Sequence, residues 1–208
     1  MQMGKKTDHV YSRSVVEFTA VAGEYCKYME HASQLRGDEM LRIMQRILPL
    51  LYLKASLLPD TEPYFEDGNE KFVSEADWSV IHDSLKRSFG TADDYPEIYD
   101  DKLTEPETPV PASISENMAD IYQDLKDFLL LYQTGTREVM NDAVWECRMN
   151  FETIWGQKLV NSLRAIHKAI YTGEEIGKHD NGENGETRDT SEWFISKRQK
   201  EFGEDTKI

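Results

Sequence analysis

Apolar residues recur at steps of three and four along five stretches of this chain, and this spacing constrains its fold more than any other feature. Such spacing places apolar side chains on one face of an α-helix, whereas a half-buried strand would alternate apolar and polar residues. No stretch alternates in that way, so the sequence predicts an all-α fold without strands. The longest repeat comprises Met140, Val144, Cys147, Phe151, Trp155, Leu159, Leu163, Ile166 and Ile170.

Capping residues set the expected beginnings of the helices. Ser14 with Glu17 and Ser74 with Asp77 have the spacing of capping boxes, in which each side chain satisfies a free backbone amide of the first turn. Ser115 is expected to cap a fourth helix. Together with the apolar repeats, these signals predict an antiparallel bundle of about five helices. The expected ranges are 14–31, 37–58, 74–90, 115–135 and about 140–173.

Prolines and glycines indicate where these helices deviate or end. Pro49 is expected to kink the second helix, because a proline removes one hydrogen bond and clashes with the preceding turn. Gly156 is expected to bend the fifth helix or to allow a close helix crossing. Residues 91–111 contain four prolines and form a long acidic loop in this prediction.

The composition changes after Gly173. Residues 178–189 are rich in Asp, Asn, Gly and Glu and are expected to be disordered, within an acidic, flexible tail formed by residues 174–208. Within it, residues 191–202 place Trp193, Phe194 and Phe202 on a short amphipathic segment, which either docks on the bundle or is offered to a partner. The predicted division is therefore a helical bundle domain, 1–173, followed by a flexible tail.

The formal net charge of −15 is concentrated in one part of the chain. Residues 60–108 carry 15 acidic and four basic residues. Because this charge repels phosphates, direct binding of nucleic acid is excluded from the prediction, and a basic protein is the expected partner. The candidate partner surface consists of Asp93, Asp94, Glu97, Asp100 and Asp101.

Other features of the sequence argue for a cytoplasmic protein without a cofactor. Cys26 and Cys147 fall on apolar helical stripes, as expected for buried, reduced thiols. No apolar run is long enough to span a membrane, so no membrane association is expected. No pair of His or Cys residues has the spacing of metal ligands, so neither a metal nor a cofactor is expected.

Two rows of acidic residues have the residue types of a metal site of the helical-bundle type. Such sites add a Glu-x-x-His step, and none occurs in this chain. Both rows also lie opposite the apolar stripes of their helices, so the sequence favours solvated faces. The rows are Asp120, Asp124 and Asp127 on the fourth helix, and Glu138, Asp142 and Glu146 on the fifth.

Residues 115–128, SENMADIYQDLKDF, and 151–167, FETIWGQKLVNSLRAIH, carry a family resemblance. They resemble an uncharacterised family of about 200-residue helical proteins, found mainly in Bacteroidetes and described as a domain of unknown function. The resemblance implies a helical fold and no particular activity. It directs interest to the segment 154–167 of the fifth helix. The candidate polar strip consists of Tyr122, Trp155, Gln157, Asn161, Arg164 and His167.

Three hypotheses of function follow. The leading one is a non-catalytic binding or accessory protein in the cytoplasm that presents its acidic region to a basic partner. The second is an enzyme of unrecognised type whose site is the polar strip. The third is a structural homodimer formed through the long fifth helix. The chain contains no short catalytic signature, which favours the first hypothesis over the second.

Overall fold

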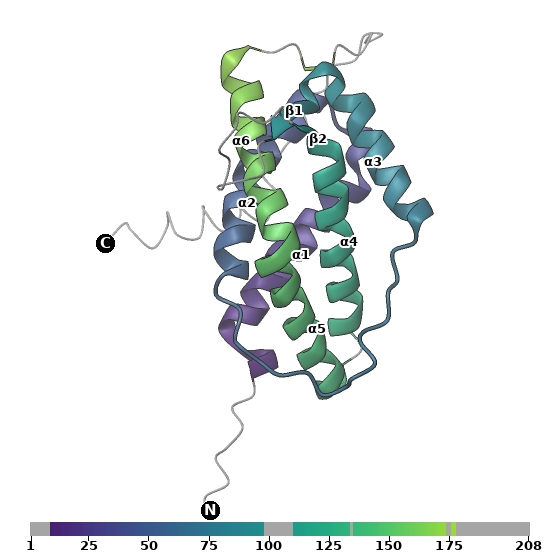
Figure 1. Ribbon diagram of the computed structural model, residues 1–208, viewed down its shortest axis with the longest axis vertical. Coiled ribbons are helices and arrows are strands. Elements are labelled where there is room, and N and C mark those ends of the chain that lie inside the picture. Colours follow the sequence, from purple (N-terminus) through teal and green to yellow (C-terminus); the bar gives the residue numbers. More distant parts are fainter. Residues whose placement is uncertain (1–8, 98–109, 134, 174–175, 178–208) are drawn as a thin grey trace, which may run out of the picture.

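The computed structural model describes residues 9–97, 110–133, 135–173 and 176–177, and the amphipathic segment predicted at 191–202 lies outside them. Most of the described chain is helical, and the long helices lie side by side (Figure 1). The predicted helical bundle is therefore confirmed. The elements are η1 His9–Tyr11, α1 Arg13–Glu30, η2 Ala32–Gln34, α2 Gly37–Ala55, α3 Glu75–Phe89, η3 Gly90–Ala92, β1 Asp94–Glu97, β2 Val110–Ser113, α4 Ile114–Tyr132, α5 Arg137–Asn150, a π-helix (η4) Phe151–Trp155 and α6 Gly156–Thr172.

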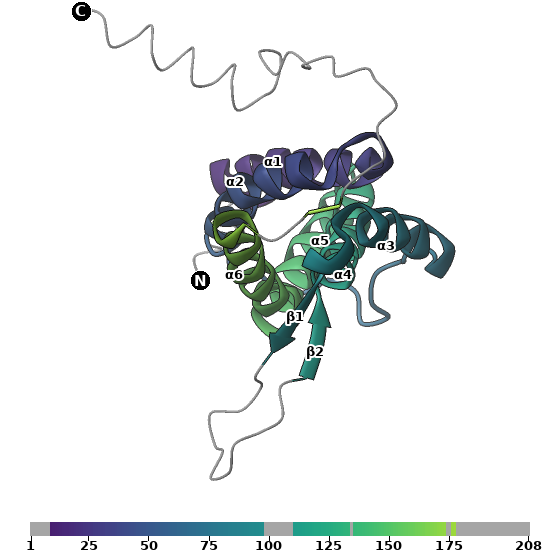
Figure 2. The ribbon, with the colours of Figure 1, turned by 90° about the horizontal axis from the view of Figure 1, so that it is seen from above.

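Helix α4 is the central element of the bundle. It packs against α1, α3, α5 and α6, while α2 packs against α1 and α6 on the far side of the core. Seen from above, α1 and α2 form one layer, and α3 lies outside α4 (Figure 2). Because α4 is surrounded in this way, residues on more than one of its faces are buried.

The helix caps agree only in part with those predicted. Ser74 and Asp77 form the predicted capping box of α3, and Gly90 ends that helix with φ 59°. Two other caps lie two residues before the predicted ones, because Ser12 caps α1 and Ser113 caps α4. Serines spaced by two residues compete for this role, and sequence alone does not decide between them.

The long fifth helix is continuous but irregular. Helices α5 and α6 are joined through the π-helix, where the Gly156 N–H bonds to the Phe151 carbonyl five residues back. A Cβ atom at Gly156 would lie 2.3 Å from that oxygen, so only glycine fits here. The predicted irregularity at Gly156 thus takes the form of a widened helical turn.

Two short strands contradict the prediction of a fold without strands. β1 pairs with β2 as an antiparallel hairpin, with Pro96 opposite Pro111. Neither proline has an N–H, so this pair occupies a position of the ladder that needs no hydrogen bond. The prolines that exclude a helix are compatible with a two-stranded ribbon, and this is why the prediction failed.

The core lies between α1, α2, α4 and the α5–α6 helix. At its centre Phe18 packs against Phe128 and Trp155. Both cysteines are buried as predicted, and burial raises the pKa of the Cys147 thiol well above its usual range. Across the described residues, no helix combines the length and the hydrophobicity that a membrane span requires.

Candidate functional site

The six residues of the candidate polar strip lie in separate environments. Trp155 is fully buried, and its indole N–H donates to the Cys147 carbonyl at 3.2 Å. Tyr122 is buried on α4, and its hydroxyl donates to Glu30 of α1 at 3.3 Å. Burial raises the pKa of Tyr122, so its hydroxyl remains a hydrogen-bond donor. These two residues belong to the core and its edge.

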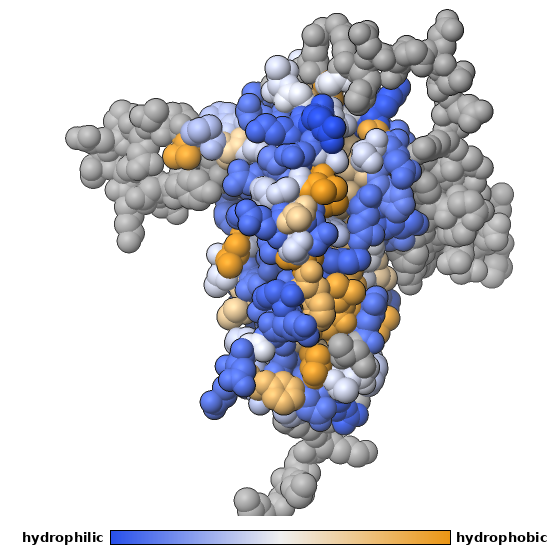
Figure 3. Space-filling view, turned by 90° about the vertical axis from the view of Figure 1, so that its right-hand side faces the viewer, coloured by the Kyte–Doolittle hydropathy of each residue, from blue (hydrophilic) through white to orange (hydrophobic). Residues whose placement is uncertain are grey.

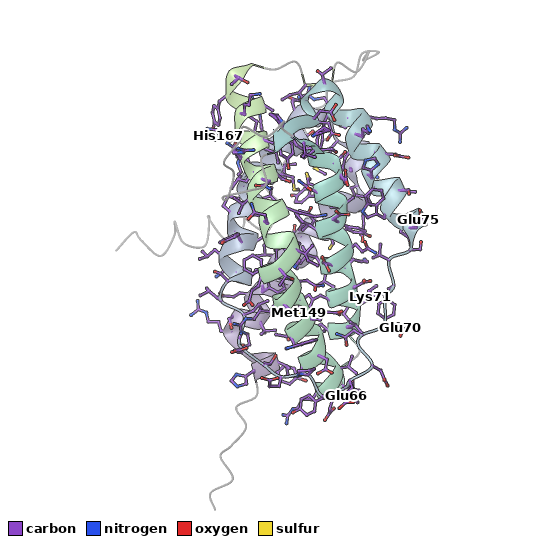
Figure 4. All side chains as sticks on the ribbon, in the orientation of Figure 1. Glu66, Glu70, Lys71, Glu75, Met149 and His167 are labelled. Carbon is purple, nitrogen blue, oxygen red and sulfur yellow. The ribbon has the colours of Figure 1, made fainter. Side chains whose placement is uncertain are left out.

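The other four residues of the strip lie on α6, with side chains that are exposed or half-buried. Gln157 donates to the Asn161 side chain at 3.0 Å, and Arg164 donates to the Pro96 carbonyl of the hairpin at 3.2 Å. His167 is exposed on α6 (Figure 4), and its ring contacts the ring of Tyr171, one turn further along the helix. The structure therefore does not bring the strip together around one cavity.

The candidate acidic surface needs a correction at Asp93, which is 1% exposed and does not belong to a surface. Asp94 is exposed at the start of β1, and Glu97 ends that strand. Asp100 and Asp101 lie outside the described residues.

Asp93 fixes the beginning of α4. Its backbone carbonyl accepts the Ile114 N–H at 2.9 Å, and its Oδ1 accepts the Ser115 N–H at 2.7 Å. Its Oδ2 accepts the hydroxyls of Ser115 at 2.7 Å and Ser113 at 3.0 Å. The third free amide of this turn, that of Glu116, donates to the Ser113 hydroxyl. A carboxylate at a helix N-terminus is also favoured by the helix dipole.

The prediction that the two acidic rows are solvated faces is wrong for most of their residues, although Glu138 at the start of α5 is exposed as predicted. Asp127 on α4 and Asp142 on α5 are each 3% exposed. We call the row on α4 together with its neighbours on α5 the acidic seam. The seam lies between α3 and the segment preceding it on one side and α5–α6 on the other. It comprises Asp120, Asp124, Asp127, Asp142 and Glu146.

The upper part of the seam joins three helices through Asp120. The Trp78 indole N–H of α3 donates to one carboxylate oxygen at 2.8 Å, and the Lys158 ammonium of α6 donates to the other. The Trp78 ring in turn stacks on His82, with centroids 4.8 Å apart and planes 9° apart. Asp120 therefore has both oxygens occupied by side chains of the protein itself.

The middle of the seam contains Asp124, which accepts a hydrogen bond from the Asn150 amide at 2.7 Å. Burial raises the pKa of this carboxyl, while the Asn150 bond and the nearby Lys71 oppose the rise. Asp127 and Glu146 add to the rise because like charges disfavour ionisation.

The lower part of the seam holds the segment between α2 and α3. We call residues 60–73 of this segment the strap. The N–H groups of Tyr64 and Phe65 donate to the two oxygens of Asp142 at 2.7 and 2.9 Å. Those of Phe72 and Val73 both donate to Asp127 Oδ1, at 2.8 and 3.0 Å. Two buried carboxylates thus fix the backbone of the strap at both ends.

The outer side of the strap is acidic and aromatic. Residues 60–83 contain eight acidic residues and one lysine, and every one of these acidic side chains is exposed. Three aromatic side chains are also exposed, namely Tyr64 at 44%, Phe65 at 52% and Phe72 at 39%. Glu66, Glu70 and Glu75 follow one another along one edge of the molecule (Figure 4). On the face turned toward this edge, apolar residues interrupt a mainly hydrophilic surface (Figure 3).

Within residues 9–97, 110–133, 135–173 and 176–177, no three His, Cys, Asp or Glu side chains are placed to hold a metal ion. A cavity of about 130 Å³ lies between η2 and α3, away from both the seam and the strip. It is lined by Ala32, Ser33, Leu35, Ser84, Arg87 and Ser88.

Sequence reasoning missed the strap and the residues that hold it. The prediction that the acidic rows face solvent assumes that α4 has only one buried face. In the structure α4 is buried on more than one face, so residues opposite its apolar stripe are covered as well. A signal was available in the pair Tyr64-Phe65, because adjacent aromatic residues in a polar stretch without helical spacing indicate a structured or binding segment.

Three comparisons relate the chain to known proteins. It matches the model of the family described as Domain of unknown function (DUF5063) over residues 9–172. It is similar to the crystal structure of protein BF1032 from Bacteroides fragilis, a structural genomics target, with 38% sequence identity and a TM-score of 0.70. That match covers 79% of this chain and 96% of the other. No curated protein matches the chain. The resemblance given by residues 115–128 and 151–167 is thereby confirmed.

Proposed function

This chain belongs to the DUF5063 family, and we propose that it is a non-catalytic binding or accessory protein of the cytoplasm whose acidic strap engages a basic partner protein. The observation that carries this proposal is the combination of exposed acidic residues, exposed aromatic residues and a fixed backbone in one segment. The binding surface is the strap with the first turn of α3, which replaces Asp93 and its neighbours as the candidate surface.

Solubility alone does not account for the strap. A solubilising segment requires charge, but it requires neither a fixed backbone nor exposed aromatic rings, which lower solubility. Glu62, Glu66, Asp67, Glu70 and Glu75 form no ion pair with any other described residue, so their charge is available to a partner. Aromatic anchors within a charged rim are the composition typical of protein interfaces.

A binding measurement with a defined probe tests this proposal. The probe is a labelled peptide rich in Lys and Arg that also contains apolar residues, and its affinity is measured by fluorescence anisotropy at low and high salt. Reversing two strap charges with Glu66→Lys and Glu70→Lys should weaken binding about tenfold, since an exposed ion pair contributes roughly 0.2–1 kcal/mol and reversal replaces attraction by repulsion.

The matched control reverses two acidic residues elsewhere, with Glu24→Lys on α1 and Glu39→Lys on α2. This variant has the same net charge as the strap variant, and its affinity should change by less than about threefold. Phe65→Ala should weaken binding without altering its salt dependence, whereas Val80→Ala, at a residue that is 65% exposed against 52% for Phe65, should not weaken binding. Equal losses in the strap and control variants would show that only net charge matters and would reject the proposed surface.

A further inference from the structure

The strap is an acidic segment that lies on acidic residues. It carries Asp60, Glu62, Glu66, Asp67 and Glu70 against a single Lys71, and it covers Asp127, Asp142 and Glu146; the Arg148 guanidinium of α5 offsets part of this charge by pairing with Asp60 at 2.9 Å. Like charges at short range oppose this docking. The strap must therefore be held by particular bonds that outweigh the repulsion.

Apolar packing does not hold the strap. From Asp60 to Phe72 every residue is exposed except Thr61 and Asn69, which are half-buried, and the buried residues Leu58 and Val73 lie at or beyond its ends. A segment with so few buried side chains remains in place only through its polar contacts.

Those polar contacts come mainly from Asp142, Asp127 and Glu146. Glu146 accepts bonds from the Asn69 amide at 3.0 Å and the Lys71 ammonium at 2.9 Å. Asn69 also donates to the Asp142 backbone carbonyl at 3.0 Å, and Asn141 donates to the Glu62 carbonyl at 2.7 Å. All these bonds connect one short segment to α4 and α5, so the loss of one weakens the others.

We infer that the strap docks on and detaches from α4 and α5 as one unit, that Asp142 is the principal latch, and that only the docked form displays the partner-binding surface. The last part of this inference rests on the proposed function, whereas the docking itself does not. The surface is then regulated from within, since any change that releases Asp142 also removes the arrangement of acidic and aromatic groups above it.

The two aspartates differ in a way that makes the inference testable. Asp142 uses both oxygens, and Asn141 also donates to its Oδ1. Asp142→Asn must therefore turn an amide N–H toward a backbone N–H. Asp127 accepts both strap N–H groups on Oδ1 alone. The asparagine in Asp127→Asn can therefore keep its amide oxygen at the position of Oδ1 and accept both bonds.

Hydrogen–deuterium exchange of the full chain measures the docking directly. In Asp142→Asn the strap amides should exchange about 10- to 100-fold faster than in the unsubstituted protein, because the N–H of Tyr64 or Phe65 loses its carboxylate acceptor. In Asp127→Asn the increase should be several times smaller. Asp124→Asn is the matched control, since it removes the same charge from the seam but pairs with Asn150 rather than with the strap. Its strap exchange should be unchanged.

Asn69→Ala with Lys71→Ala provides a second test that leaves both aspartates and all helices intact. Strap exchange should again increase, while exchange in α4 and α5 stays the same. Unchanged strap exchange in this variant and in a folded Asp142→Asn protein would overturn the inference. Slower or faster exchange throughout α4 and α5 would show that Asp142 stabilises the bundle rather than the strap, which also overturns it.

Binding of the basic peptide to the same variants separates the inference from the proposed function. If the unsubstituted protein does not bind the peptide, the proposed function fails while the exchange result stands. If it binds, affinity should fall in proportion to the docked fraction obtained from exchange. Equal affinity in a variant whose strap is mostly detached would contradict the coupling between docking and binding.

Discussion

Replacement of Asp93 tests whether this residue organises the fold or belongs to an acidic surface. The carboxylate is 1% exposed and accepts three hydrogen bonds at the start of α4. Asp93→Ala removes the acceptor of the Ser115 N–H, a residue with no exposed surface. If Asp93 were a surface residue, its replacement would leave no buried N–H without an acceptor and would change the stability little.

The expected cost follows from the partners that remain. The unpaired Ser115 N–H costs about 1–3 kcal/mol, and the lost charge-assisted bonds add to this. Two effects reduce this loss of stability. The Ser113 and Ser115 hydroxyls lie 2.8 Å apart and can pair with each other. The substitution also removes a buried charge, which is itself costly to bury. We expect Asp93→Ala to lower the free energy of unfolding by about 3 kcal/mol. Asp93→Asn keeps one oxygen for the Ser115 amide and should cost about 1 kcal/mol.

Urea unfolding followed by circular dichroism measures these differences, with the slope of the transition reporting any change in compactness. The neighbouring Asp94→Asn is the control, since Asp94 is exposed and the same charge is lost; we expect a change below about 0.5 kcal/mol. If Asp93→Ala and Asp94→Asn had equal stabilities, Asp93 would not have the capping role assigned to it.

Two further predictions concern α6 and the pair of helices α1 and α2. Gly156→Ala should destabilise the protein by about 2 kcal/mol or more, because the added Cβ would meet the Phe151 carbonyl at 2.3 Å, whereas Gly23→Ala in open space on α1 should stabilise it by about 0.5–1 kcal/mol in the same urea assay. The Lys54 ammonium, followed by the Arg13 guanidinium, lowers the pKa of Glu17 to about 2, so the contribution of these pairs is present above pH 4.5 and is lost as the pH falls toward 2. Lys54→Met should raise the pKa of Glu17 in an NMR titration, and an unchanged value would contradict the assignment.

The helices were predictable because their signals are local. The capping box at Ser74 and the glycine at position 90 predicted both ends of α3 to within one residue. The apolar repeat predicted the fifth helix along its length, although a π-helix interrupts its regular geometry in the middle. The hairpin was not predictable, because its strands are only four residues long and each contains a proline, a residue that indicates a loop in the sequence. Whether Ser113 or Ser115 capped α4 depended on Asp93, a residue 20 positions away that the sequence does not connect to either.

The candidate site was predicted only at the level of composition. The excess of acidic residues in 60–108 was visible, but its division into buried and exposed groups depends on tertiary packing. Asp127 and Asp142 look like solvated residues until α4 is known to be the central helix and the strap to cross it. The aromatic residues of the strap carried no periodicity, so they belonged to none of the predicted helices.

The two stretches that carry the family resemblance explain the scaffold more than the binding surface. Residues 115–128 contain Ser115, Asp120 and Asp127, and residues 151–167 contain Gly156 and Lys158. Each of these has a packing, capping or pairing role in the structure. The strap lies in neither stretch, although the family match spans it. The binding surface itself is therefore tested by substitutions in residues 60–73, whereas Asp124→Asn and Asp127→Asn, which lie in the first stretch, test how the strap is held.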